Sequence, residues 1–388
     1  AAQRRGGRGK SATSMKEDDY IQHLIVTSNH ATVLCFTNVG KVYRLKVYDV
    51  PQASRGAKGR PMVNLLPLDA NETITAILPV IDAPKKFKDR LVDFQAFVKA
   101  NKAKLQENKI INAHFVELEA ALAELEDGAN DLSDALRIQL KQLGIELSGT
   151  DLDDDIINDF AQQAEAVRKN FYVFMATEYG TIKRVELEQF SNVRSNGLRA
   201  LELNGDDRLI GVAITDGEQQ IMLFSNEGKA IRFAETDVRS MGRSAKGVRG
   251  MRVTIGASQV EETEENDVDV EDEDNSDSVV ISRIVSLVVV PETGEVLCAS
   301  EHGYGKRTPV DDFPTKKRGG KGVIALKTSE RNGELIGAVS IDASKELMLI
   351  SDGGTLVRTR ASEVAQTGRN AQGVRLIRLS NDELLVGV

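Results

Sequence analysis

The sequence is poor in the residues that mark several common protein classes. It has no Trp and only 5% aromatic residues, and its two cysteines, Cys35 and Cys298, lie in apolar runs without a C-x-x-C pair. We therefore expect two buried free thiols in a reducing cytoplasm, not a disulfide framework or a thiolate metal site. The four histidines show no metal-ligand spacing.

Membrane segments and catalytic motifs are missing as well. The apolar run at Ile284–Val290 is far too short to cross a membrane, and no signal peptide is recognisable. We find no metal cluster, no nucleophile with a neighbouring base and no phosphate-binding loop that opens a helix. The sequence therefore predicts a non-catalytic chain that needs no cofactor or metal and does not bind a membrane.

Charge is distributed unevenly along the chain, although the net charge is −9. Residues 261–278 carry eleven acids and no base, and residues 84–168 carry 11 Lys and Arg against 17 Asp and Glu. Subtracting −11 and −6 from −9 leaves +8 for the rest of the chain. Because local charge decides which partners a surface attracts, this basic remainder favours an anionic partner.

A hairpin pattern centred on glycine recurs in the basic remainder. Each copy has two short apolar runs around a turn glycine, and an arginine follows that glycine by four residues. Such runs are typical of a β-hairpin, and a repeat of about 48 to 51 residues is typical of propeller blades. The copies span residues 33–44, 174–184, 222–232, 297–307 and 348–358, and their arginines are Arg44, Arg184, Arg232, Arg307 and Arg358.

A basic, glycine-rich loop recurs six times. The strongest copy, residues 3–10, has four cations in eight residues, and a phosphate backbone is the best match for such a cluster. Glycine permits positive φ and lets backbone N–H groups approach an anion. The candidate DNA-binding residues are Gln3, Arg4, Arg5, Gly6, Gly7, Arg8, Gly9, Lys10, Arg55, Lys58, Arg60, Arg194, Arg199, Arg243, Lys246, Arg249, Lys316, Lys317, Arg318, Lys321, Arg369 and Arg375.

Two insertions interrupt the repeat. From residue 84 to 168 the apolar residues follow helical spacing, as in Leu91, Phe94 and Val98. This predicts three or four packed amphipathic helices, over residues near 91–98, 115–125, 132–143 and 156–160, inserted between two strands of one blade. The second insertion, 261–278, is too acidic and too poor in apolar residues to fold, so we expect a disordered loop.

Residues Gln3–Lys10 resemble the box motif of the DNA gyrase A family, and Tyr304–Thr308, Gly353–Arg360 and Arg55–Pro61 are similar to that family too. The resemblance covers nearly the whole chain apart from the two insertions. It implies an all-β fold, a propeller-like β-pinwheel of six blades, over residues 1–83 and 169–388, with an inserted α-helical subdomain at 84–168. The hairpin that should precede the box is absent, so we expect an incomplete first blade in a fragment of a longer polypeptide.

The resemblance also implies a function. The domain of this family wraps double-stranded DNA around a basic rim and presents a segment for ATP-dependent strand passage and negative supercoiling. The implied partners are the B protein of DNA gyrase (GyrB) and the N-terminal domain of the A protein (GyrA), in an A2B2 enzyme of the bacterial cytoplasm associated with the nucleoid. ATP and Mg²⁺ act elsewhere in that enzyme, the catalytic tyrosine is not in this chain, and the isolated domain is expected to be monomeric.

Four alternatives stay open at this stage. The chain could be the corresponding domain of topoisomerase IV, although that relative typically has a degraded box. It could also be an interaction platform that docks proteins on the helical insertion. The five turn arginines could bind DNA or form ion pairs between blades. The acidic loop could be a solvated linker or a phosphate mimic that competes for the rim.

Overall fold

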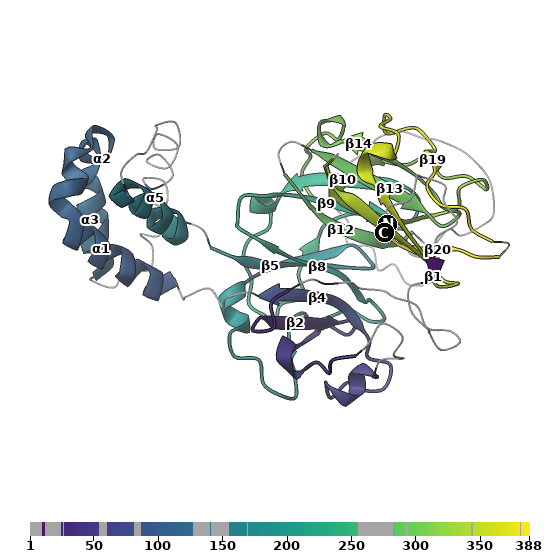
Figure 1. Ribbon diagram of the computed structural model, residues 1–388, viewed down its shortest axis with the longest axis horizontal. Coiled ribbons are helices and arrows are strands. Elements are labelled where there is room, and N and C mark those ends of the chain that lie inside the picture. Colours follow the sequence, from purple (N-terminus) through teal and green to yellow (C-terminus); the bar gives the residue numbers. More distant parts are fainter. Residues whose placement is uncertain are drawn as a thin grey trace, which may run out of the picture. The chain divides into compact units, whose positions relative to one another are not determined.

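The computed structural model describes residues 10–11, 25, 27–53, 60–80, 87–126, 140, 155–168, 170–254, 282–291, 294–342, 344–380 and 382–388. The chain divides into two compact units, one formed by Ala1–Asp82 with Val173–Val388 and the other by Ala83–Tyr172. The first unit is built of β-sheets and the second of helices (Figure 1). Most of the candidate DNA-binding loops belong to the described part of the first unit.

The first unit contains the five hairpins that the repeat predicts. Each turn glycine has positive φ, between 75° at Gly40 and 82° at Gly180, which L side chains rarely adopt. The hairpins are β2 (Thr32–Thr37) with β3 (Lys41–Lys46), β5 (Tyr172–Thr177) with β6 (Thr181–Glu186), β9 (Gln220–Ser225) with β10 (Lys229–Ala234), β13 (Glu295–Ser300) with β14 (Tyr304–Pro309), and β17 (Glu346–Ser351) with β18 (Thr355–Arg360).

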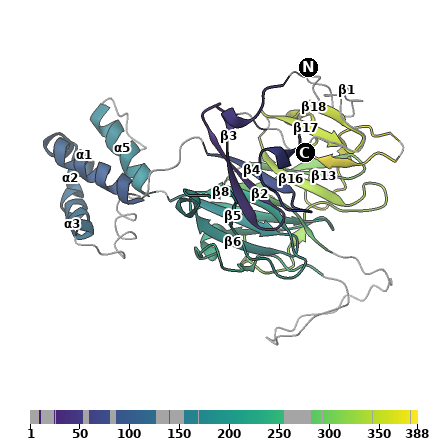
Figure 2. The ribbon, with the colours of Figure 1, turned by 90° about the horizontal axis from the view of Figure 1, so that it is seen from below.

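A third strand extends each hairpin on its first strand. These inner strands are β4 (Ile74–Val80), β8 (Leu209–Thr215), β12 (Ile284–Val290), β16 (Leu335–Ile341) and β20 (Leu385–Gly387). They contact one another in this order, so the sheets follow each other along the chain, as the colours of Figure 2 show. Shared hydrophobic cores join each sheet to the next.

The fourth strand of each sheet comes from another repeat. The two-residue strands β7 (Leu198–Arg199), β11 (Val248–Arg249), β15 (Val323–Ile324) and β19 (Val374–Arg375) each pass over the hairpin just before them and pair with the hairpin of the preceding repeat, and β1 (Lys10–Ser11) pairs with β18. We number the sheets as blades 1 to 5: β4-β2-β3-β7, β11-β6-β5-β8, β12-β9-β10-β15, β16-β13-β14-β19 and β1-β18-β17-β20. Each sheet thus contains one strand contributed by another repeat.

The strand Lys10–Ser11, near the start of the sequence, therefore completes the sheet of the last hairpin. The described residues form five sheets of four strands, and Lys10–Ser11 supplies the fourth strand of the last one. The five predicted hairpins are confirmed. The predicted fold class, an all-β pinwheel with a helical insertion, is confirmed.

Short 3-10 turns follow the hairpins where an apolar and acidic stretch is seen in the sequence. Five of them come directly after the second hairpin strands: η1 (Val47–Asp49), η3 (Leu187–Phe190), η4 (Glu235–Asp237), η5 (Val310–Asp312) and η6 (Ala361–Glu363). A further turn, η2 (Met62–Asn64), precedes β4. The first five lead the chain toward the basic loops.

The second unit is helical, with α1 (Phe87–Glu107), α2 (Lys109–Ala113), α3 (Phe115–Glu126) and α5 (Asp155–Arg168). Phe94 and Phe160 meet in its core with ring centroids 5.6 Å apart, and the side chain of Asn108 caps α2 by accepting from two backbone N–H groups. Three of the predicted helices are confirmed. The fourth, 132–143, lies outside the described residues except for the buried, helical Leu140.

The insertion point differs from the prediction. The helices follow β4 and precede β5, and these two strands belong to blades 1 and 2. The insertion thus occupies a connection between blades, not one between strands of a single blade. The reason is that each inner strand pairs with the hairpin before it, which the repeat spacing does not reveal. The acidic segment 261–278 lies outside the described residues.

Candidate nucleic-acid interface

The basic loops end in edge strands that occupy one equivalent position in every blade. Arg199, Arg249 and Arg375 are the second residues of β7, β11 and β19, and they pair with the first residues of β3, β6 and β14. All three side chains are exposed, whereas the preceding apolar residue is half-buried. The alternation of side chains along a strand therefore directs one arginine to solvent in each of blades 1, 2 and 4. Blade 3 has Ile324 at this position, with 44% of its surface exposed.

A glycine before each edge strand allows the loop to approach the hairpin. Gly197, Gly247, Gly322 and Gly373 have φ between 79° and 92°. A Cβ on Gly322 would lie 2.6 Å from the backbone oxygen of Ala230, closer than real Cβ contacts allow. Only glycine satisfies both the conformation and the space, so these residues position the loops.

The described candidate residues fall into an exposed group and a half-buried group. Arg60, Arg194, Arg199, Lys246, Arg249, Lys316, Lys317, Lys321 and Arg375 are exposed, while Arg243, Arg318 and Arg369 are half-buried. Gln3–Gly9, Arg55 and Lys58 lie outside the described residues. Lys10 is placed only through its backbone, which pairs with Leu356 as Val248 pairs with Ile182. Lys10, the last residue of the box, therefore pairs with blade 5 at the register that the other edge strands use.

Two of the half-buried arginines join neighbouring loops. Arg318 donates from Nη1 to the backbone oxygen of Arg249 (2.9 Å), and Arg369 donates from Nη1 to that of Ile324 (3.2 Å). Both acceptors are the second residue of the preceding edge strand. These two guanidinium groups therefore hold one basic loop against the next, a role that the sequence alone did not indicate.

Backbone hydrogen bonds continue this connection. Gly319 N–H donates to Gly250 (2.6 Å), and Arg252 N–H donates to Gly320 (2.9 Å), which links the loops of blades 2 and 3. The loops of blades 2 and 3 are consequently fixed to each other as well as to the hairpins they pair with. Rigid loops lose little conformational entropy when they bind a ligand.

Buried lysines support two loops from below. Lys183 and Lys306 are completely buried, and their Nζ atoms donate to the backbone oxygens of Arg243 and Arg369 at 2.5 Å. Lys306 also donates to Gly368 (2.6 Å). Burial lowers the pKa of both lysines to about 8. The equivalent positions in the other blades are Tyr43, Ile231 and Val357, so this support is confined to blades 2 and 4.

The turn arginines face neighbouring blades. Arg184 forms an ion pair with the buried Glu235 (3.3 Å), Arg232 donates to Val310 O (2.9 Å), and Arg307 donates to Val364 O (2.8 Å). Each partner belongs to the next repeat. Of these three, Arg184 forms the ion pair between blades that the sequence left open, whereas Arg232 and Arg307 contact the next repeat through backbone oxygens.

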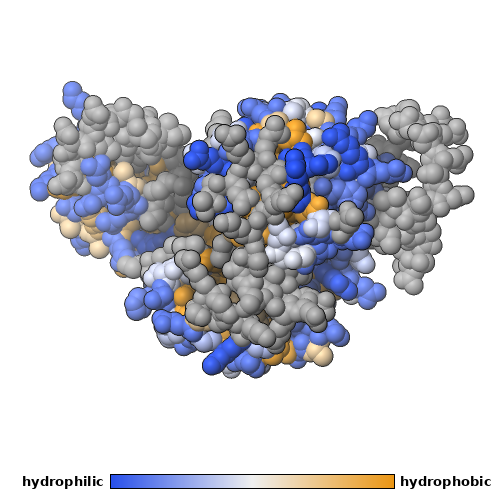
Figure 3. Space-filling view, turned by 45° about the vertical axis from the view of Figure 1, so that its right-hand side comes forward, coloured by the Kyte–Doolittle hydropathy of each residue, from blue (hydrophilic) through white to orange (hydrophobic). Residues whose placement is uncertain are grey.

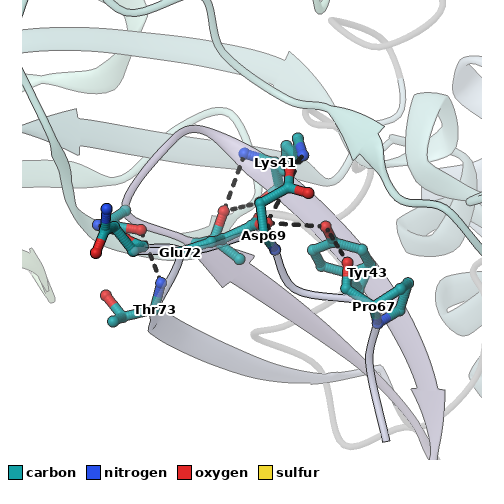
Figure 4. Close-up of polar contacts among 9 residues, drawn as sticks. Lys41, Tyr43, Pro67, Asp69, Glu72 and Thr73 are labelled. Atoms are coloured by element: carbon teal, nitrogen blue, oxygen red, sulfur yellow. Dashed lines mark hydrogen bonds and ion pairs between the residues drawn. The ribbon is translucent and has the colours of Figure 1, made fainter. Parts of the chain in front are cut away.

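A network of acids neutralises the edge of blade 1 (Figure 4). Lys41, which pairs with Arg199, forms ion pairs with Asp69 and with Glu72 (3.6 Å). Glu72 is buried and also accepts from the Tyr43 hydroxyl (3.1 Å). The hydrogen bond to Asp69 is the main cause that raises the pKa of Lys41. Lys41 is therefore a paired cation and not a free one.

The corresponding edge of blade 4 is cationic. Tyr304, which pairs with Arg375, lies under the guanidinium groups of Arg375 and Arg331. Arg331 is absent from the candidates chosen by sequence because it lies outside the glycine-rich loops. Arg331 lies in the turn before β16, and it is revealed only by its contact with the ring of Tyr304, which it shares with Arg375 of the edge strand β19.

The described surface is mainly hydrophilic in the view of Figure 3, with small hydrophobic patches. Both cysteines are buried and free. Within the described ranges, no cluster of three or more His, Cys, Asp and Glu residues has the arrangement of a metal site, and no helix has the length and apolar character of a membrane span.

Comparisons with known proteins agree with this geometry. The family model for the DNA gyrase C-terminal domain, described as a beta-propeller, matches residues 1–28, 31–81, 172–216, 219–266, 294–342 and 345–388, and so leaves out the helical unit. The DNA gyrase A protein of Pseudomonas aeruginosa is 45% identical, and that of Escherichia coli 38%. Both alignments cover 100% of this chain but only 35% and 32% of those proteins.

Two solved structures share the fold. A DNA gyrase A C-terminal domain matches with a TM-score of 0.64 at 20% identity, covering 100% of this chain and 91% of that one. The C-terminal domain of DNA topoisomerase IV matches with a TM-score of 0.57 at 17% identity, covering 92% and 78%. The chain spans about a third of the length of its curated relatives.

Proposed function

Because this chain belongs to the DNA gyrase C-terminal domain family, we propose that it binds double-stranded DNA without sequence specificity and wraps it along the basic loops with one handedness. The DNA contacts are the exposed cations of the loops, together with the box at Gln3–Lys10, Arg55 and Lys58. The loop cations that the structure describes lie in loops and edge strands and not on a helix, so they contact phosphates and do not read bases.

The observation that carries the proposal is the repeated register of the edge strands. Arg199, Arg249 and Arg375 stand at one position of three blades, and neighbouring loops are joined by hydrogen bonds. Smooth bending of a short DNA site costs roughly 1–6 kcal/mol. Contacts distributed over successive blades offset that cost along the whole arc, which a single basic patch would not do.

The similarity to DNA gyrase A proteins supports a role of this chain within a larger enzyme. We infer that the chain acts within a bacterial, cytoplasmic, nucleoid-associated A2B2 enzyme, together with the N-terminal part of the gyrase A protein and with the gyrase B protein. There it presents the wrapped segment for ATP-dependent strand passage that introduces negative supercoils. The chain itself needs no cofactor and supplies no catalytic tyrosine. ATP and Mg²⁺ act in other parts of the enzyme, and the isolated chain is a monomer.

A topology assay tests the wrapping. The chain is titrated onto relaxed plasmid, the plasmid is relaxed again with a type I topoisomerase, and the change in linking number is read at several salt concentrations. We expect a stoichiometric change of one sign. Exchange of Arg199, Lys246, Arg249 and Lys321 for Gln removes four phosphate contacts, so the log–log salt slope of binding should fall by about 3 to 4.

The matched control exchanges four exposed lysines of the helical unit for Gln: Lys99, Lys102, Lys104 and Lys109. This variant has the same net charge as the loop variant and should leave the linking-number change intact. If saturating amounts of the unaltered chain produce no change, the wrapping proposal is wrong. Equal losses in both variants would show that net charge, and not the loops, governs binding.

A further inference from the structure

Two guanidinium groups converge on one tyrosine at the edge of blade 4. The Cζ atom of Arg331 lies 4.9 Å from the ring centroid of Tyr304, and that of Arg375 lies 5.4 Å away. Arg375 also donates from Nη2 to the tyrosine hydroxyl (2.9 Å). The tyrosine is 7% exposed, while both arginines are exposed. The phenol thus forms a floor beneath two solvent-facing cations.

Both arginines are held by the surrounding backbone. Arg375 is the cross-strand partner of Tyr304 in the β14–β19 ladder. Arg331 lies in the turn before β16, where the side chain of its neighbour Asn332 donates to Lys327 O (2.9 Å) and Gln372 O (3.3 Å). The turn that carries Arg331 is therefore tied to the basic loop that carries Arg375.

The charges of this cluster are not balanced by acids. Within the part of the chain that the structure describes, neither Arg331 nor Arg375 forms an ion pair with a carboxylate, whereas the nearby Arg283 is paired with Glu334 (3.3 Å). The two arginines lower the pKa of Tyr304, chiefly through their hydrogen bonds to its hydroxyl. Two like charges held together repel, and a bound anion relieves that repulsion.

We propose that Tyr304, Arg331 and Arg375 form a phosphate clamp that binds one phosphodiester group of the DNA path. This inference rests on the proposed DNA binding and adds a specific site to it. Guanidinium groups present planar forks that match phosphate oxygens. Stacking on the ring restrains both forks before binding, so less entropy is lost when the phosphate arrives.

The test compares Arg331→Ala with Arg283→Ala in the full chain, using a fluorescent 40-base-pair duplex at 50 to 200 mM salt. Both variants lose one exposed arginine, but only Arg331 belongs to the clamp. Loss of one phosphate contact should reduce the salt slope by about 0.9, so the affinity deficit of Arg331→Ala should shrink about 3.5-fold across this salt range. Arg283→Ala should keep the slope of the unaltered chain.

A second measurement reports on the site itself. With carbon-13-labelled tyrosine, the ring signal of Tyr304 is identified by its loss in Tyr304→Phe. We expect this signal to shift when the duplex is added to the unaltered chain and to stay in place in Arg331→Ala. Arg331→Lys keeps the charge without the fork and should restore the salt slope but only part of the shift.

The outcomes separate the two proposals. DNA binding with an unchanged slope in Arg331→Ala and no shift of the Tyr304 signal would overturn the clamp and leave the proposed function standing. Absence of DNA binding by the unaltered chain would overturn both. Equal effects of Arg331→Ala and Arg283→Ala would mean that only the overall charge matters, which also contradicts the clamp.

Discussion

Blades 1 and 4 have the same backbone ladder, but the edge of blade 1 is neutralised by acids and that of blade 4 is cationic. In both, the first residue of the second hairpin strand pairs with an exposed arginine, Lys41 with Arg199 and Tyr304 with Arg375. In blade 1 the turn before the inner strand supplies Asp69 and Glu72, which neutralise Lys41. In blade 4 the equivalent turn supplies a cation. The repeat therefore dictates the position of this edge, and the turn before the inner strand decides its charge.

The same two blades each contain a lysine in the second hairpin strand, and the two lysines differ in burial and in the direction of their pKa shift. Lys41 is partly exposed and its pKa is raised, first by its hydrogen bond to Asp69. Lys306, two residues beyond Tyr304, is fully buried and its pKa is lowered to about 8 by desolvation. Lys41 is stabilised in its charged form by Asp69. Lys306 holds the loop at Arg369 by a hydrogen bond, but its burial destabilises its charged form.

The largest predicted effect concerns the turn arginines of these blades. Arg307 is 9% exposed, donates to Val364 O (2.8 Å) and pairs with Glu295. Exchange for Ala leaves these acceptors without a partner and should lower the free energy of unfolding by about 3 kcal/mol. Arg44 is exposed and has only a 3.5 Å contact to Ser191 O, so Arg44→Ala should cost about 0.5 kcal/mol or less. Urea unfolding at pH 7 measures both.

Similar losses in the two variants would contradict this ranking. The comparison also tests whether the boundary between blades 4 and 5 is held more firmly than that between blades 1 and 2. Circular dichroism checks that Arg307→Ala and Arg44→Ala are both folded before urea is added. The unfolding measurement uses no DNA, so it does not depend on DNA binding.

The second prediction uses pH to distinguish the two lysines. Between pH 8 and 10.5 the folded chain releases the proton of Lys306 while the unfolded chain retains it, so stability rises with pH. A pKa lowered from 10.5 to about 8 corresponds to at most about 3 kcal/mol. Lys306→Met should remove its share of this rise, as measured by urea unfolding at several pH values, while the share of Lys183, whose pKa is also lowered to about 8, remains.

Lys41→Met serves as the control with the opposite sign. Because the folded pKa of Lys41 is raised, its contribution is present below the unfolded value and is lost as pH rises through the folded value. The Lys41 variant should therefore keep the rise between pH 8 and 10.5. An unchanged rise in Lys306→Met would mean that this lysine is not the titrating group.

The smallest effect concerns DNA affinity at blade 1. Asp69→Asn removes the nearer of the two carboxylates that pair with Lys41 and leaves Glu72 at 3.6 Å, so the salt slope of binding should steepen by at most about 0.9. The exposed ion pair contributes less than about 1 kcal/mol to stability. Fluorescence anisotropy with the 40-base-pair duplex measures the slope, and Asp342→Asn, which removes an exposed acid paired with Lys345 (3.3 Å), is the matched control. Equal slopes in both variants would show that the pairing of Lys41 does not limit binding.

The sequence is informative wherever a property depends on neighbouring residues. The five turn glycines predict the hairpins because only glycine adopts their positive φ without strain. The apolar spacing around Phe94, Phe115 and Phe160 predicts the helices because each one buries a single face. Neither result requires knowledge of which segments meet in space.

The candidate site was only partly accessible in this way. Loop composition identified Arg199, Arg249 and Arg375, which are exposed at equivalent edge positions. It did not separate them from Arg318 and Arg369, whose guanidinium groups bind backbone oxygens of the preceding loop. It missed Arg331 entirely, since this residue reaches the edge of blade 4 from the turn before another strand.

The sequence by itself determined the repeat, the hairpins, the positions of the basic loops and the two insertions, because these follow from local conformation and from the period of apolar residues. The tertiary structure decided which cations are paired, which are buried and which face solvent. Strand exchange places each loop on a hairpin of another repeat, so the partners of Lys306, Arg318 and Arg331 come from distant segments. Charge at a protein surface depends on such partners, and no local pattern in the chain specifies them.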